Sequence, residues 1–413
     1  MRATAGEGST DHFAWGPTVR ATELKGLLGY LESAKAEFIE AVSDLARIES
    51  PSRVPESQRG VQELLTGWLE RLGFRVRIVP GESTGGHLMA VPVGRMRGAS
   101  FQMLIGHTDT VWALGTLENM PVELDEEQAV LRGPGVFDMK AGLVQAVFAL
   151  RALRYVGLWP TVTPVFFLNS DEEIGSGESE VHIARLAKRA NRALVLEPAL
   201  GPDGNLKTTR RGTGEVNIRV VGKASHAGLA PTEGASAIEE LSHVIQALHA
   251  LTDHDRGVGV NVGEVRGGVR PNVVAPEAHA VVDLRVDTME DARWLEEQIR
   301  GLRATTPGTR LEITGGVSRV PMEATPRNQV LWQAAKEAGE RLGLELEGSL
   351  SGGASDGNIT SQFTATLDGL GPVGDGAHAA HEFVATDRLV ERTALLALVL
   401  LLPKLEDTQA QTK

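Results

Sequence analysis

Histidine and carboxylate side chains that directly follow buried strands are the residues of this chain best able to do chemistry. The clearest case is His107 and Asp109, which follow the apolar run at 101–105 and the turn residue Gly106. They lie two positions apart, so in an extended chain both side chains point to the same side. Such a pair can begin a metal site at the carboxyl end of a strand, where α/β sheets bind their ligands. The alternative is a hydrogen-bonded turn, and the other strand ends must decide between the two.

Further acidic and imidazole residues fall at the predicted ends of strands or helices. They are Asp138 after the sequence GPG, Glu172 and Glu173 after TPVFFLNS, Glu197 after ALVL, and His378 within GDGAHAAHE. Each alone has an ordinary explanation, for example Asp138 as a helix N-cap, the glutamate pair as a solvated turn and Glu197 as a loop charge. Gathered at one edge of a sheet, however, these charges would destabilise the fold unless a cation neutralised them.

This set of side chains could hold two divalent metal ions. Two histidines and three carboxylates suffice when one carboxylate bridges both ions, and two-metal sites of this kind promote hydrolysis. A further carboxylate must then accept a proton from the attacking water, and Glu172 beside Glu173 suits that role. The chain has no cysteine, so only His, Asp and Glu can be ligands, which favours zinc, manganese or cobalt.

The elements that must position these residues indicate an α/β fold. The first half of the chain alternates predicted helices at 24–47, 58–72, 138–155 and 180–190 with predicted strands at 74–79, 87–93, 101–105, 163–169 and 192–196. This alternation favours a mostly parallel sheet that is covered on both faces. The same sheet resumes late in the chain with a helix at 328–342, a strand at 365–367 and a last helix from Asp387.

Between these two parts the pattern changes to strand, helix, strand, strand, helix, strand. The predicted ranges are 216–223, 235–251, 258–265, 278–286, 289–303 and 310–314. This order is the split βαβ (ferredoxin-like) plan, and it indicates an inserted domain. We therefore expect an N-terminal arm at 1–22, a main domain built from 23–205 and 319–413, and an inserted domain at 206–318.

Composition argues against several classes of function. The net charge of −13 and the pI near 5.4 argue against a nucleic-acid partner. Residues 1–20 lack the apolar core of a secretory signal, and the most apolar segment, 394–402, is too short to span a bilayer. We expect no membrane partner, a buried C-terminal helix and a cytoplasmic location. An NAD-dependent enzyme is poorly supported, because no G-x-G-x-x-G lies between a predicted strand and a helix.

One further motif has a structural explanation. The sequence GESTG at 81–85 matches the G-x-S-x-G nucleophile elbow, which requires a strand, a sharp turn and then a helix. Here the turn joins two predicted strands, so we interpret the motif as a hairpin loop.

Several stretches of the chain resemble the M20 family of di-zinc metallopeptidases, and within it the carboxypeptidase G2-like glutamate carboxypeptidases. They are GHTDTV, GPGVFDMKAG, NSDEEIGS, LEP, GKASHAG and GAHAAHE, and the resemblance extends from about Leu24 to Leu405. It implies a zinc-exopeptidase catalytic domain interrupted by a lid domain that also forms a homodimer. It also implies two zinc ions per chain, with cobalt or manganese as possible replacements.

The resemblance assigns the metal ligands to individual residues. Asp138 would bridge the two zinc ions. His107 and Glu197 would bind one ion. Glu173 and His378 would bind the other.

Two of these assignments need a further argument. The last motif contains two imidazoles, and the ligand of the family precedes a glutamate by four positions. Glu382 therefore selects His378 over His381. In the same family pattern Asp109 orients His107 from outside the metal.

The resemblance also implies residues for catalysis and substrate binding. Glu172 would be the general base. His226 would donate to the oxyanion in the active site of the partner subunit, although a histidine in such a loop can also be an ordinary turn residue. Asn272 and Arg285 would hold a substrate carboxylate, which the planar guanidinium of arginine meets with two hydrogen bonds. Strand alternation also allows Arg285 to be a plain surface residue, and Gly353 would line the pocket.

Three functions remain open from the sequence. The first is hydrolysis of an amide bond that releases a free C-terminal amino acid, of glutamate type, from a peptide or an N-acyl amino acid. The second keeps this chemistry but acts as an N-acyl amino acid deacylase of the acetylornithine deacetylase or aminoacylase type. The third is a metal-free binding protein on the same fold, which is disfavoured because competent residues fill every metal position and the base.

Overall fold

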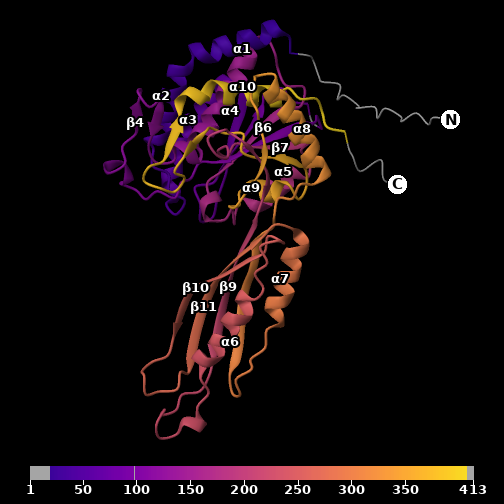
Figure 1. The fold of residues 1–413 in the computed structure, drawn as a ribbon. Helices are drawn as coiled ribbons and strands as arrows, with labels where there is room; N and C mark the ends of the chain where they lie inside the picture. Colours follow the sequence, from indigo (N-terminus) through magenta and orange to yellow (C-terminus); the bar gives the residue numbers. More distant parts are fainter. Residues whose placement is uncertain (1–18, 97, 407–413) are drawn as a thin grey trace, which may run out of the picture.

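The computed structural model describes residues 19–96 and 98–406. Figure 1 shows a main domain that contains both ends of the described chain and an elongated second unit, which projects away from it. We call this second unit, residues 212–319, the lid. Most of the N-terminal arm expected at 1–22 lies outside the described residues, and the domain boundaries given above stay predictions.

The main domain is built on a six-stranded mixed sheet. Its order is β1 (Phe74–Val79), β2 (His87–Pro92), β6 (Thr163–Asn169), β3 (Phe101–His107), β7 (Arg192–Val195) and β14 (Ala365–Leu367). The strands from β6 to β14 run parallel to one another, whereas β1 and β2 form an antiparallel hairpin at one edge. The hairpin loop contains GESTG, so that interpretation is confirmed.

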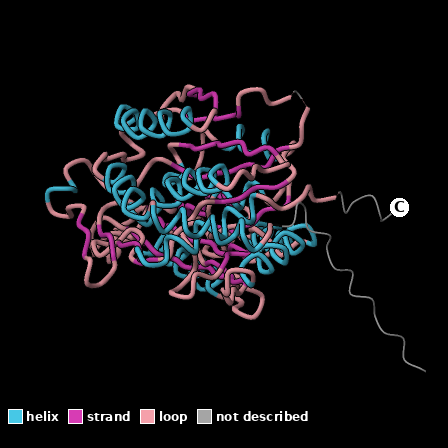
Figure 2. The backbone as a smooth tube through the Cα atoms, turned by 90° about the horizontal axis from the view of Figure 1, so that it is seen from above, coloured by secondary structure: helices cyan, strands magenta, loops and turns pink. Residues whose placement is uncertain are grey.

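Helices cover both faces of this sheet, and Figure 2 shows them from above, lying over the strands. One layer comprises α1 (Ala21–Ser33), α2 (Lys35–Ala46), α3 (Gln58–Arg71), α4 (Ala141–Tyr155), α8 (Pro326–Glu340) and α10 (Leu389–Leu400), which share one apolar core. The opposite face packs against α5 (Glu180–Ala187) and α9 (Asp356–Thr360). The central strand β3 is buried along its whole length, as the apolar run predicts.

The single helix expected at 24–47 is wrong, because the chain bends at Ala34 and forms two helices. The α1 half packs against α10 and α4, whereas α2 packs against α4 and the turn at 136–140. The two halves therefore follow different neighbours. The expected C-terminal helix is confirmed as the buried α10. Within residues 19–96 and 98–406, no helix combines the length and the apolar character needed to cross a bilayer.

The lid has the expected split βαβ plan. Its elements are β9 (Gly212–Val221), α6 (Ala237–His249), β10 (Gly259–Gly267), β11 (Glu277–Val286), α7 (Met289–Gly301) and β12 (Arg310–Arg319), and its sheet order is β10-β11-β9-β12 with every pairing antiparallel. Strand β12 extends five residues beyond the expected end at Thr314. A Gly315-Gly316 pair resembles a strand end in the sequence, yet pairing with β9 continues through it.

Two small sheets were not predicted. One consists of β15 (Gly374–Asp375), β16 (Phe383–Ala385), β5 (Val130–Arg132) and β4 (Glu123–Asp125), and the other of β13 (Gly348–Ser351) and β8 (Leu206–Arg210). These strands are too short to show a hydrophobic period. They matter for the site, because β16 pairs with β5 and so brings the segment before β16 next to the segment after β5.

A close approach between α4 and β7 generates the first prediction. A Cβ atom at Gly142 in α4 would lie 2.1 Å from the carbonyl oxygen of Leu196, just after β7. Alanine normally stabilises a helix relative to glycine by about 1 kcal/mol, but here it must push α4 away from the sheet. We expect Gly142→Ala to lower the free energy of unfolding by about 1–3 kcal/mol, measured by denaturant titration.

The matched control is Gly29→Ala in α1, where a Cβ atom would meet open space. That variant should be neutral or more stable by up to about 1 kcal/mol. Equal effects of the two substitutions would show that the contact with Leu196 does not constrain the fold.

Candidate metal centre

The sheet register brings the predicted strand ends together. His107 at the end of β3 lies opposite Asn169 at the end of β6, and Ile105 of β3 lies opposite Val195 at the end of β7. The glutamates that follow β6 and β7 therefore reach the same edge of the sheet as His107. This juxtaposition was expected from the parallel order of the strands.

His107 is buried and lies against two carboxylates. Its Nε2 atom is 3.2 Å from Oδ1 of Asp138 and 3.3 Å from Oε1 of Glu197. Its other ring nitrogen, Nδ1, is 2.9 Å from the backbone oxygen of Asp109 and 3.5 Å from a carboxylate oxygen of the same residue. One nitrogen thus faces the cluster while Asp109 fixes the other.

His378 approaches the same aspartate from the opposite side. Its Nε2 atom is 3.4 Å from Oδ2 of Asp138 and 3.1 Å from Oε2 of Glu173. The two oxygens of Asp138 therefore face two different histidines, which is the arrangement of a bridging carboxylate. The alternative His381 is exposed, and no contact with this carboxylate pair is found for it among the described residues.

The cluster fits divalent cations by its chemistry. One donor atom each from His107, Asp138 and Glu173 lie within 4.8 Å of one another, a spacing that one ion could fill. Oε1 of Glu173 is buried without a hydrogen-bond partner, which is unusual for a carboxylate oxygen. Burial raises the pKa of Glu173, as expected for an acid that lacks a cation.

The two histidines stabilise the carboxylates of the cluster. Burial alone would raise the pKa of Asp138, but hydrogen bonds from His107 and His378 outweigh it and hold this pKa well below its ordinary value. Hydrogen bonds to Asp138 and Glu173 raise the pKa of His378 to about 10. Both shifts have the same cause, because each imidazole faces these carboxylates directly.

The backbone at Asp138 is not helical, so the helix expected from 138 is wrong and α4 begins at Ala141. The cause is Glu382, which is fully buried in the segment before β16. Its Oε1 accepts the backbone N–H groups of Phe137 and Asp138, at 2.9 and 3.0 Å. These bonds hold the chain in an open turn, and so Asp138 is not an N-cap but is presented to both histidines.

Glu382 also binds the start of this turn. Its Oε2 accepts the N–H of Gly135 at 2.9 Å and Nε1–H of Trp112 at 2.8 Å. The sequence analysis used Glu382 only to choose between two histidines and missed this role. The sequence feature that could have pointed to this role is the fixed spacing between Glu382 and His378.

Asp109 joins the two strand ends that carry the cluster. Its Oδ2 accepts the Ser52 hydroxyl at 2.6 Å and the N–H of Glu173 at 3.2 Å, and its Oδ1 accepts the N–H of Glu172 at 3.3 Å. Asp109 therefore positions the Glu172–Glu173 turn as well as the ring of His107.

The proposed base, Glu172, lies beside an arginine that the sequence analysis missed. Nη2 of Arg319 is 3.4 Å from Oε1 of Glu172 and also donates to its backbone oxygen at 3.2 Å. Burial raises the pKa of Glu172 well above its ordinary value, and the positive charge of Arg319 opposes this shift. Arg319 is the last residue of β12, where the predicted strand had already ended.

A second missed arginine lies at Glu197. Nη2 of Arg210 is 3.4 Å from Oε2 of Glu197, and its guanidinium forms two hydrogen bonds with Asp368, at 2.7 and 3.1 Å. Nη1 of Arg210 donates to the backbone oxygen of Gly353 at 3.0 Å, which ties the predicted pocket loop to the centre. Arg210 ends β8, immediately before the lid begins.

The lid residues predicted for catalysis and binding are not gathered at this centre. His226 forms a β-bridge with Val273, and the N–H of Ala227 donates to the backbone oxygen of Asn272 at 3.0 Å. Both predicted residues are exposed and lie beyond the Val221 end of β9, whereas its Gly212 end joins the main domain.

Arg285 lies nearer the main domain, opposite Thr213 in the sheet register. Its guanidinium is held by Asp283, with Nε and Nη2 at 2.9 and 3.0 Å from the two carboxylate oxygens. Asp283 occupies the Nε and Nη2 side of the guanidinium, so Nη1 and the second N–H of Nη2 can still donate to a substrate carboxylate.

Comparison with known proteins identifies the family. A model of peptidase family M20/M25/M40 matches residues 103–402. The chain belongs to this family. The resemblance read from the motifs is thereby confirmed, and this M20 chain is a metallohydrolase of the carboxypeptidase or deacylase kind.

Individual relatives cover most of the M20 chain. It is 28% identical over 381 residues to carboxypeptidase G2 of Pseudomonas sp. (strain RS-16), which covers 88% of each protein. It is 28% identical over 360 residues to acetylornithine deacetylase of Edwardsiella ictaluri (strain 93-146), covering 83% of this chain and 90% of that protein. The crystal structure of aminopeptidase PepT from Bacillus cereus ATCC 10987 has a TM-score of 0.74 at 20% identity, covering 89% and 98% of the two chains.

The contacts of Glu382 generate the second prediction. All four of its partners are donors, so Glu382→Gln would place an amide NH₂ against N–H groups and loosen the turn that presents Asp138. Residues that orient metal ligands typically contribute about 10–100-fold to metal affinity. We expect a loss of that size in a competition titration against a chelator. The exposed carboxylate Glu345, changed to Gln, is the control and should leave metal affinity unchanged. Unaltered metal binding by Glu382→Gln would refute this role.

Proposed function

We propose that this M20 enzyme hydrolyses an amide bond and releases a C-terminal amino acid, of glutamate type, from a peptide or an N-acyl amino acid. The observation that carries the proposal is Asp138, whose two oxygens face His107 and His378. The similarity to carboxypeptidase G2 along nearly the whole chain supports the class of substrate.

The proposed cofactors are two zinc ions per chain, with cobalt or manganese as replacements. His107, Asp138 and Glu197 would hold one ion, and Asp138, Glu173 and His378 the other. When bound, zinc supplies Lewis acidity that polarises water and the scissile carbonyl group.

Glu172 is the proposed general base. It accepts a proton from the attacking water on its carboxylate and then gives this proton to the leaving amine. Burial raises the pKa of Glu172 and so favours the protonated form after transfer, whereas the positive charge of Arg319 favours the carboxylate that accepts the proton. Because burial and Arg319 shift the pKa of Glu172 in opposite directions, the side chain is suited both to accept the proton from water and to give it to the leaving amine.

The lid residues complete the proposal. His226 would donate to the oxyanion of the tetrahedral intermediate, and Asn272 and Arg285 would hold the substrate carboxylate. His226 and Asn272 lie at the end of the lid that is remote from their own main domain. We therefore infer that the chain acts as a homodimer in which one lid serves the site of the partner subunit. The cytoplasmic location stays a prediction.

A second candidate function is deacylation of an N-acyl amino acid. The chain is as similar in identity to acetylornithine deacetylase as to carboxypeptidase G2, at 28%. Both functions use the same metal centre and base, and they differ in the released amino acid, which has an acidic side chain in the glutamate type and a side-chain amine in the ornithine type.

A substrate panel tests the proposal. The zinc-loaded enzyme is assayed for released primary amine with N-benzoyl-glutamate, N-acetylornithine and N-benzoyl-4-aminobutyrate, which lacks the α-carboxylate. The first should be hydrolysed fastest and the third hardly at all. Preference for N-acetylornithine would favour the second function. Hydrolysis that survives complete removal of metal by a chelator would contradict the metal-dependent mechanism.

The third prediction separates the base from the ligands. Glu172→Gln keeps the size of the side chain but cannot accept the proton, so turnover should fall by about 10²–10⁴-fold with metal content retained. Glu173→Gln removes a charged ligand and should instead lower metal occupancy. Metal content is measured by elemental analysis beside the rate. Identical behaviour of the two variants would mean that the adjacent roles are assigned wrongly.

The fourth prediction concerns the lid. His226→Ala should retain zinc and substrate affinity but lose turnover by about 10²–10³-fold, because an oxyanion donor acts in the transition state. Arg285→Ala should mainly raise KM, because it removes ground-state binding of the carboxylate.

Mixing subunits tests which site His226 serves. In dimers of His226→Ala and Glu172→Gln chains, one of the two sites has both functional groups if the lid acts across the dimer. Random reassociation gives about half mixed dimers, so activity should reappear on mixing. Purified mixed dimers as inactive as either parent would show that His226 serves its own subunit or has no catalytic role.

A further inference from the structure

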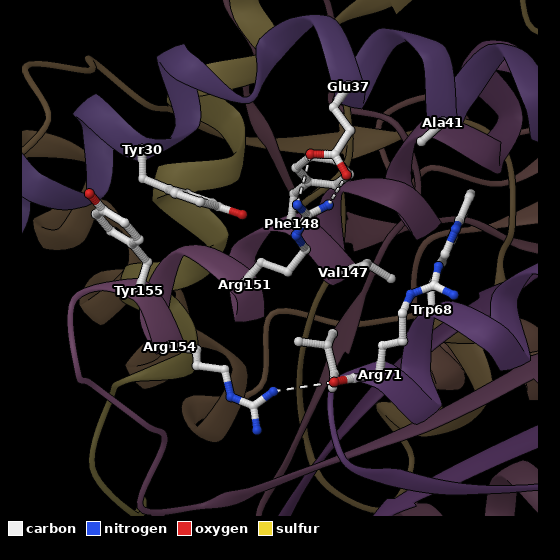
Figure 3. Close-up of a pocket in the computed structure, with 11 residues that line it drawn as sticks. Tyr30, Glu37, Ala41, Trp68, Arg71, Val147, Phe148, Arg151, Arg154 and Tyr155 are labelled. Carbon is white, nitrogen blue, oxygen red and sulfur yellow. Dashed lines mark hydrogen bonds and ion pairs between the residues drawn. The ribbon is translucent and has the colours of Figure 1, made fainter.

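A cavity lies in the helical layer of the main domain, away from the metal centre. It has a volume of about 430 Å³ and is bordered by α1, α2, α3 and α4 (Figure 3). None of the residues described above for the metal centre lines it. Its size falls in the range of sites that hold small organic molecules, about 300–1,000 Å³.

Aromatic side chains form much of its surface. Tyr30 and Tyr155 stack with their ring centroids 4.8 Å apart, and they are the only two tyrosines in the chain. Phe148 also lines the cavity, but its ring is stacked on Phe38 and covered by the guanidinium of Arg151, so it is not open to a ligand. Trp68 lies at the other end of the cavity, beside the guanidinium of Arg71 (Figure 3). Flat apolar surfaces of this kind favour a planar ring as the occupant.

The same cavity has an excess of positive charge. It is lined by three arginines and one acid, Glu37, whose two oxygens lie 2.7 and 2.8 Å from the guanidinium of Arg151. Arg71 and Arg154 form no ion pair with any described residue. The one bond found for the Arg154 guanidinium goes to the backbone oxygen of Arg71, at 3.3 Å. The guanidinium of Arg154 is therefore available to an anion. Arg71 lies near enough to Glu37 to add to the hydrogen bonds of Arg151 in lowering the pKa of that carboxyl.

We propose that this cavity binds an aromatic carboxylate. Its ring would pack against the stacked tyrosines, and its carboxylate would accept hydrogen bonds from Arg154, with Arg71 adding positive charge. Guanidinium groups suit this ligand for two reasons: they bind carboxylates through parallel hydrogen bonds, and they also interact with aromatic faces. A neutral ring would leave Arg154 without an anion, and an anion without a ring would leave the tyrosine surface exposed.

Another basic cavity of the main domain provides an internal control. It is lined by Arg77, Arg95, Arg185 and Arg189 and has a volume of about 230 Å³. It is more basic but lacks the stacked tyrosines and the tryptophan. Removing two of its exposed arginines changes the charge of the protein by the same amount as removing Arg71 and Arg154.

The test uses 2-naphthoate as the probe and calorimetric titration of the full-length enzyme, with metal bound and after metal removal. We expect binding in both forms with a stoichiometry of about one per chain. The double variant Arg71→Gln/Arg154→Gln should weaken binding by about tenfold or more, since charge-assisted hydrogen bonds are lost. The uncharged probe 2-naphthamide should bind the unaltered enzyme about tenfold more weakly for the same reason.

Further variants separate this cavity from other sites. Tyr155→Ala replaces an exposed residue and should weaken the binding of both probes, that of 2-naphthoate at least as much as that of 2-naphthamide. Arg185→Gln/Arg189→Gln should leave the affinities of both probes within about twofold of those of the unaltered enzyme. Circular dichroism and thermal unfolding verify that each variant is folded. Absence of binding at millimolar probe, dependence on bound metal, or an unchanged affinity in Arg71→Gln/Arg154→Gln would each overturn the proposal. None of these outcomes depends on which amide the metal centre hydrolyses.

Discussion

Crowding of carboxylates at one edge of a sheet is the constraint on which the rest of this structure depends. Parallel strands end together, so the acidic residues that follow β3, β6 and β7 must share one cleft. Without compensation their repulsion would open the sheet at that edge. Two histidines lie between the acids, and the guanidinium groups of Arg210 and Arg319 lie beside Glu197 and Glu172. The cluster therefore requires positive charge, which divalent metal ions would supply.

Backbone N–H groups provide the second part of this compensation. Asp109 accepts those of Glu172 and Glu173, and Glu382 accepts those of Phe137 and Asp138. Asp109 and Glu382 are buried carboxylates that do not face the cluster. Each of them fixes the backbone of a residue whose side chain does face it. The geometry of the centre therefore rests on acids that a metal would not touch, which is the usual way in which ligand orientation is held.

Much of this could be predicted from the sequence, and the failures have a common cause. Long apolar strands, the hairpin and the split βαβ order were found because hydrophobic periodicity is a local signal. The residues expected to be ligands were selected because they lie within distinctive motifs. Arg210 and Arg319 were missed because the residues that they bind, Asp368 and Glu172, lie 158 and 147 positions away along the chain, and a single arginine carries no signal for such a distant partner. The helix start at Asp138 failed for the same reason, since a residue more than two hundred positions away sets its backbone.

The positions of those two arginines limit how the enzyme can be divided into modules. Arg210 and Arg319 stand at the two chain crossings between the main domain and the lid, and each ends in the metal centre. A lid exchanged with a relative at junctions outside these residues would carry away part of the charge balance of the centre. Junctions inside them, within 212–318, would leave it intact. A lid can therefore be exchanged without disturbing these charges only if both junctions lie within the lid strands.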